Sequence, residues 1–86
     1  MTILELKDIS REENFIYYRR EFTATAVYDL HGKHHTGQIK FTIETEPTGK
    51  KDIHVTLIDA VDYPVLPVLK ALKDFILAMD REGMLP

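Results

Sequence analysis

Residues 38–59 read QIKFTIETEPTGKKDIHVTLID, and they predict a β-hairpin. Apolar residues alternate with polar ones on both sides of a central turn: Ile39, Phe41 and Ile43 before it, and Ile53, Val55 and Leu57 after it. Period-two alternation with one apolar face is typical of a half-buried strand. Pro47 fits the second position of a type I turn, and Gly49 fits the left-handed position that follows. The stretch therefore predicts two antiparallel strands.

The turn also predicts how the two strands pair. If Glu46 pairs with Lys50, the apolar residues meet in three cross-strand pairs: Ile43 with Ile53, Phe41 with Val55, and Ile39 with Leu57. A shift by one residue would place isoleucine opposite threonine or histidine, so this register is well specified. The two inward faces then form one side of a core.

A third strand precedes the hairpin at residues 22–30, where Phe22, Ala24, Ala26 and Tyr28 share a face. Two connections to the hairpin keep the faces matched. A tight turn at His31-Gly32 would pair Leu30 with Lys33, whereas a longer loop would end at Gly37. The sequence leaves both open.

The N-terminal third gives weaker signals. Residues 2–7 predict a strand with Leu4 and Leu6 on one side. Ser10-Arg11-Glu12-Glu13 has the spacing of a capping box, which indicates a single helical turn. Phe15-Ile16-Tyr17-Tyr18 has the aromatic and β-branched content of a strand. The charged Arg19-Arg20-Glu21 indicates a bend or bulge, because one strand over residues 15–30 would be unusually long.

An amphipathic helix is predicted at the C-terminal end. Its apolar stripe follows the three-four spacing over four turns: Val65, Val68, Leu69, Leu72, Phe75, Ile76 and Met79. Pro64 or Pro67 suits the first turn, and Gly83 suits the stop after Arg81. We therefore expect one α+β domain over residues 1–86, in two layers. An antiparallel β-meander of about four strands carries the C-terminal helix on the face of Phe41 and Val55.

Composition and charge argue against several classes of protein. The chain has 86 residues, no cysteine and a formal net charge of -3 at pH 7. Without cysteine there is no disulfide, no thiolate nucleophile and no sulfur ligand for zinc. The first eight residues lack the basic start and apolar core of a signal peptide, and no apolar run approaches the roughly 20 residues of a membrane span. We expect a cytoplasmic protein with no membrane partner.

Residues for catalysis or metal binding are sparse. Ser10 is the only serine, and it lies beside acidic residues rather than a histidine. The histidines His31, His34 and His35 cluster near one turn, with His54 elsewhere. A metal site needs ligands that converge from a rigid frame, which a glycine-flanked turn does not supply. We therefore expect no catalytic residue, no cofactor and no physiological metal, with an enzymatic or small-molecule-binding domain as a further alternative.

Nucleic acid is the main alternative ligand. Lysines and histidines gather near the predicted hairpin tip, in reach of a phosphate backbone: Lys33, His34, His35 and Lys40. Against this, the outward face of the predicted sheet is rich in threonine and lacks aromatic residues in its central strands. Phe22 and Phe41 are expected to point inward.

Two stretches, residues 29–39 and the turn Gly49-Lys50-Lys51-Asp52-Ile53 before the helix, support this alternative. They resemble the single-strand-binding transcriptional coactivator domains. Those domains share the order of four strands and a helix, and a Gly-Lys-Lys-Gly-Ile turn. Here Asp52 replaces the last glycine, and Ile43-Glu44-Thr45-Glu46 stands where that family has an aromatic, basic strand. The resemblance implies binding of single-stranded nucleic acid.

A protein-interaction module is the function that the sequence favours. Four residues lie along one flank of the predicted helix, off its apolar stripe: Leu66, Lys70, Lys73 and Leu77. A small core gains from additional burial, so we expect a homodimer, with an unidentified protein partner as an alternative. A monomer would result if residues 3–9 folded over these leucines.

Overall fold

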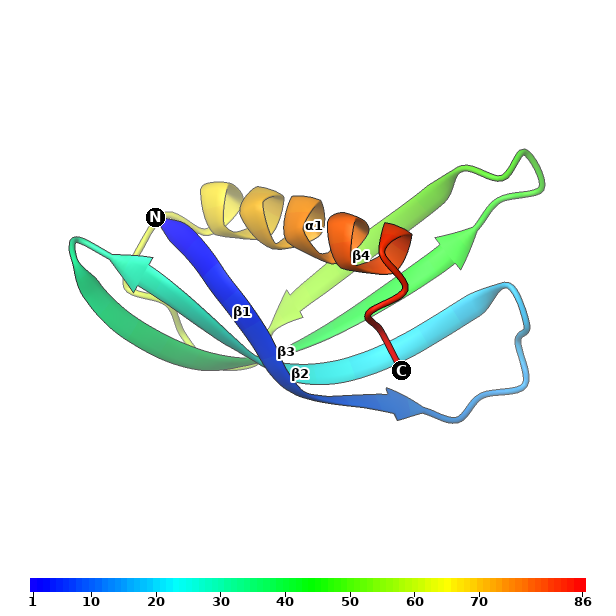
Figure 1. Cartoon of the computed structure of the whole chain (residues 1–86), viewed down its shortest axis with the longest axis horizontal. Coiled ribbons are helices and arrows are strands. Elements are labelled where there is room, and N and C mark those ends of the chain that lie inside the picture. The colour runs from blue at the N-terminus through cyan, green and yellow to red at the C-terminus, as the bar shows by residue number, and fades with distance from the viewer.

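The computed structural model describes all 86 residues and contains four strands and one helix. These are β1 (Thr2–Glu12), β2 (Arg19–Leu30), β3 (Lys33–Thr45), β4 (Lys51–Leu57) and α1 (Val65–Arg81). All neighbouring strands are antiparallel and follow the chain in the order β1-β2-β3-β4 (Figure 1). The predicted α+β meander with a C-terminal helix is confirmed.

The predicted strand register is also confirmed. Between β3 and β4, the three apolar pairs are Ile43 with Ile53, Phe41 with Val55, and Ile39 with Leu57. Between β2 and β3, Leu30 pairs with Lys33, which selects the tight turn. His31 and Gly32 have φ angles of 52° and 78°. Positive φ at both central residues matches the right-handed twist of the flanking strands.

Strand β1 differs from the prediction because it contains two bulges. One additional residue, Leu4, lies between the pairs that Ile3 and Glu5 make with β2, and a second irregularity lies between Lys7 and Ser10. Each bulge shifts the inward position by one residue. As a result Ile3, Leu6 and Ile9 contact the core at a spacing of three, whereas Leu4 is exposed. The prediction that Leu4 and Leu6 share a side is wrong.

Two further predictions for the N-terminal third are wrong. Ser10-Arg11-Glu12 continues β1, and Glu13 follows it without a helical turn. Arg19-Arg20-Glu21 opens β2 rather than bending the chain. Both strands continue there because each residue finds a cross-strand partner, such as Glu44 for Arg19. An ion pair of 3.5 Å joins the same two side chains.

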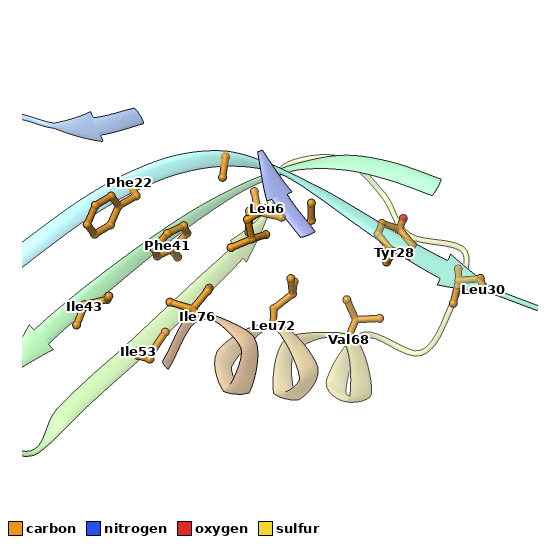
Figure 2. Close-up of a cluster of buried hydrophobic side chains, with 13 residues drawn as sticks. Leu6, Phe22, Tyr28, Leu30, Phe41, Ile43, Ile53, Val68, Leu72 and Ile76 are labelled. Atoms are coloured by element: carbon orange, nitrogen blue, oxygen red, sulfur yellow. The ribbon is translucent and has the colours of Figure 1, made fainter. Parts of the chain in front are cut away.

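The core lies between the sheet and the helix. Figure 2 shows side chains from all four strands pointing towards one face of α1. Phe22 and Phe41, cross-strand partners from β2 and β3, stack with ring centroids 4.9 Å apart. Only 14 of the 86 residues are buried, so each core side chain carries a large share of the burial.

Helix α1 rests on the predicted face of the sheet. Val68, Leu72 and Ile76 are its buried residues, whereas Val65, predicted in the stripe, is 51% exposed. The helix lies nearest to β4 and β1, so the sheet brings both of its edge strands to the helix. Gly83 ends it with a φ of 67°, as predicted, and the Met84 N–H donates to the Met79 carbonyl. The helix is too short and too polar to cross a membrane.

Candidate interaction surfaces

The most exposed apolar surface is the connection between β1 and β2, residues 13–18, which we call the aromatic loop. Three of the eight aromatic residues of the chain lie in it. Phe15 is fully exposed, Tyr17 is 96% exposed and Tyr18 is half exposed. Contiguous exposed apolar side chains of this kind mark interaction sites on soluble proteins.

The aromatic loop has a defined backbone, although it is not the predicted strand. The Asn14 side-chain oxygen accepts a hydrogen bond from the Ile16 N–H at 3.0 Å. The Ile16 carbonyl accepts one from the Arg19 N–H, and the Tyr18 carbonyl accepts one from the Thr45 N–H of β3. The loop is therefore closed at its base, and its side chains project beyond the sheet. Its signal in the sequence was four consecutive large apolar residues, which a sheet with one buried face does not accommodate.

Two hollows flank the aromatic loop. The first, of about 750 Å³, is lined by the two tyrosines and by the start of the β3–β4 connection: Tyr17, Tyr18, Glu44, Thr45, Glu46 and Pro47. The second, of about 650 Å³, is lined by the end of β1 and the loop itself: Arg11, Glu12, Glu13, Asn14, Phe15, Ile16 and Tyr17. Aromatic rings and carboxylates thus share both walls.

The predicted helix flank is only partly at the surface. Leu66 is 79% exposed, and Lys70 and Lys73 are exposed. Leu77 is half-buried and packs against the core. Strand β1 passes beside α1, as the monomer alternative required, but it leaves Leu66 uncovered. We call Leu66, Lys70, Lys73 and Leu77 the helix edge.

The residues proposed for nucleic acid are not gathered on one surface. In the β2–β3 register, Lys33 and His35 alternate onto the face that carries the core, and His34 and Lys40 onto the opposite face. His35 stacks on Tyr28 with ring centroids 5.7 Å apart. The Lys40 ammonium lies 3.6 Å from a Glu12 carboxylate oxygen, which neutralises it.

The histidines are also separated. His31 lies against the Tyr63 ring, with centroids 6.4 Å apart, and His54 lies 3.1 Å from an Asp52 carboxylate oxygen. No group of three or more histidine, aspartate or glutamate side chains is arranged to hold a metal ion. That the protein binds no physiological metal stays a prediction.

The strongest electrostatic interaction joins α1 to the sheet. Asp80 accepts two hydrogen bonds from the Arg20 guanidinium, of 2.9 and 3.2 Å, and one from the Lys51 ammonium. The hydrogen bond with Arg20 holds the pKa of Asp80 below its ordinary value of 3.8, although partial burial opposes this, and Lys51 adds to the lowering. With both cations engaged by Asp80, this cluster serves to hold the helix.

The fold and its exposed surfaces define a small α+β domain of four strands and a helix, with an aromatic loop at one end. The chain belongs to a protein family whose model matches residues 1–81, which include every strand and the whole helix. Searches of curated proteins and of solved structures returned no match.

Proposed function

We propose that this chain is a non-catalytic self-association module that acts as a homodimer in the cytoplasm. The aromatic loop is the observation that carries the proposal. Phe15 and Tyr17 present large apolar side chains that no other part of the chain covers. Such rings are typical anchors of protein interfaces, where their burial contributes most of the binding free energy.

The accessible surface supports the same proposal. The chain exposes 5794 Å² and measures 40 × 23 × 22 Å. A compact monomer of 10.0 kDa exposes about 5,200 Å². The elongated shape thus leaves more surface than a monomer of this mass usually has, and association would cover part of it.

Sedimentation equilibrium at several micromolar concentrations tests the proposal. We expect a monomer–dimer equilibrium for the natural chain. The double variant Phe15→Ser, Tyr17→Ser should shift it towards monomer, because the loop side chains make no contribution to the core. Ile58→Ser is the matched control, since it removes an exposed apolar side chain outside the loop. A natural chain that stays monomeric throughout would contradict the proposal.

Binding of single-stranded nucleic acid is the second candidate, favoured by the same exposed rings. Unpaired bases stack on exposed aromatic side chains, and each stack contributes about 1–3 kcal/mol. Arg11 and Arg19 lie near the loop, but Arg19 is paired with Glu21 and Glu44. Fluorescence anisotropy with a labelled single-stranded oligonucleotide tests it. Binding that weakens steeply with salt and is lost in Tyr17→Ala would support this candidate.

A further inference from the structure

The charges around the aromatic loop are predominantly negative. The two hollows carry four carboxylates, from Glu12, Glu13, Glu44 and Glu46, and a single guanidinium, from Arg11. Glu12 and Glu44 already have ion-pair partners, whereas Glu13 and Glu46 have none. A surface that combines exposed rings with unpaired carboxylates is complementary to an apolar partner that carries positive charge.

The geometry of the two tyrosines favours a cation in particular. The rings of Tyr17 and Tyr18 are nearly perpendicular, at 86°, with centroids 5.7 Å apart. Both rings border the hollow that Glu46 also lines. An ammonium group within about 6 Å of a ring centroid is attracted by the face of the ring. A lysine side chain entering this hollow would meet ring surface and a carboxylate together.

A basic and apolar surface of this kind exists on the chain itself. Lys70 and Lys73 are exposed on the helix edge and form no ion pair, and Leu66 beside them is the most exposed residue of α1 among the large apolar ones. At about 100° per residue, these three side chains fall within a sector of about 60° on the helix. The helix edge thus has the composition that the aromatic loop requires.

We infer that the aromatic loop of one copy docks on the helix edge of a second copy, with a lysine in the hollow beside Tyr17 and Tyr18. The inference rests on the proposed self-association and names its two surfaces. In Figure 1 the β1–β2 connection and the start of α1 lie at opposite ends of the molecule. Two copies placed side by side and antiparallel would therefore form the contact twice, and a two-fold axis closes such an assembly at the dimer.

The area available agrees with a stable dimer. Each large aromatic side chain buries about 150–250 Å², so Phe15 and Tyr17 of both copies contribute about 600–1,000 Å². The helix surfaces that receive them lose a similar area. The total of about 1,200–2,000 Å² is the size of a standard specific interface.

Complementation between two defective variants tests the reciprocal contact. Tyr17→Ala keeps an intact helix edge, and the double variant Lys70→Glu, Lys73→Glu keeps an intact loop. Alone, each variant should dimerise at least about tenfold more weakly than the natural chain, because both of its contacts are impaired. Mixed, they should form a heterodimer that retains one intact contact, which native mass spectrometry resolves by mass.

Charge reversal tests the predicted partners. Glu46→Lys should weaken the dimer by about tenfold, and Glu46→Lys combined with Lys70→Glu should recover most of the loss. Glu5→Lys and Lys7→Glu, at exposed positions of β1, are matched controls that should leave dimerisation unchanged. A natural chain that is strictly monomeric would overturn both the inference and the proposed function. A dimer that is indifferent to the loop or helix-edge variants, or a mixture without heterodimer, would overturn this inference alone.

Discussion

Asp80 is the residue through which the C-terminal end of α1 is fixed to the sheet. Its side chain is only 6% exposed and receives hydrogen bonds from Arg20 of β2 and Lys51 of β4. A carboxylate so placed stabilises the fold in its ionised form, and two strands and the helix depend on the one group.

We expect Asp80→Asn to lower the free energy of unfolding at pH 7 by about 1.5–3 kcal/mol, because hydrogen bonds to a charged group are lost and Arg20 is left without its partner. The pKa of Asp80 is lower in the folded than in the unfolded chain, so its stabilisation is complete above its ordinary value of 3.8 and is lost as the pH falls through the folded value. Urea denaturation of both proteins from pH 7 to pH 3 should show the difference shrinking below pH 3.8. Asp74→Asn, at an exposed position of α1, is the control. An equal difference at every pH would contradict this account.

Phe41 is the second residue on which stability should depend. It is 1% exposed and stacks on Phe22 in the middle of the core. We expect Phe41→Ala to lower the free energy of unfolding by about 3–5 kcal/mol, through lost burial and the cavity left behind. A domain of this size has only about 4–13 kcal/mol in total, so the variant should be close to unfolding at 25 °C by circular dichroism.

Ile43→Val provides the scale for that measurement. Ile43 is fully buried on the same strand, and the loss of one methylene group should cost about 0.5–1.5 kcal/mol. If both variants proved equally stable, the stack of Phe22 and Phe41 would not be a central part of the core.

Among the elements, the turn between β2 and β3 makes a sharp test of backbone geometry. Gly32 has a φ of 78° and open space around its Cα, so Gly32→Ala meets no clash but forces alanine into a left-handed conformation. We expect a loss of about 1–2 kcal/mol in the free energy of unfolding. Gly37 in β3 has no positive φ, and an added Cβ would meet Tyr28 and Asp59 at an ordinary 3.9 Å. Gly37→Ala should therefore be neutral or slightly stabilising, and thermal denaturation of both variants should rank them in this order.

The elements that sequence patterns predicted are those with one buried and one open face. The alternation in β3 and β4 and the stripe of α1 repeat the geometry of the element, so period alone identifies them. The bulges of β1 break that link, because Ile3, Leu6 and Ile9 at a spacing of three match neither a regular strand nor a helix. Local sequence does not specify where an additional residue enters a strand pair.

The candidate surfaces were predictable to a smaller extent. Leu66, Lys70 and Lys73 were found because helical spacing places them off the stripe. The aromatic loop was predicted as a strand, because β-propensity describes residues that fit a half-covered pleated surface. Whether anything covers residues 15–18 is decided by where β2 and β3 place them, which no local pattern contains.

For the molecule as a whole, self-association should appear in the dependence of thermal stability on concentration. A dimer that forms only from folded chains stabilises the folded state by mass action. We expect the melting temperature of the natural chain to rise as the protein concentration is raised, and that of Tyr17→Ala to rise less. The Tyr17 side chain is outside the core, so at the lowest concentration the two melting temperatures should agree. Identical curves at all concentrations would count against a dimer that uses the loop.

The two bulges of β1 also decide how far the sheet can grow. An edge strand presents a row of free N–H and C=O groups that recruits strands from other chains and, repeated, leads to fibrils. In β1 that row is interrupted at Leu4 and again beside Asp8, whose φ is 52°. An incoming strand therefore finds no long, regular ladder on this side. Open-ended stacking of sheets is blocked there by the backbone itself, whatever side chains the strand carries.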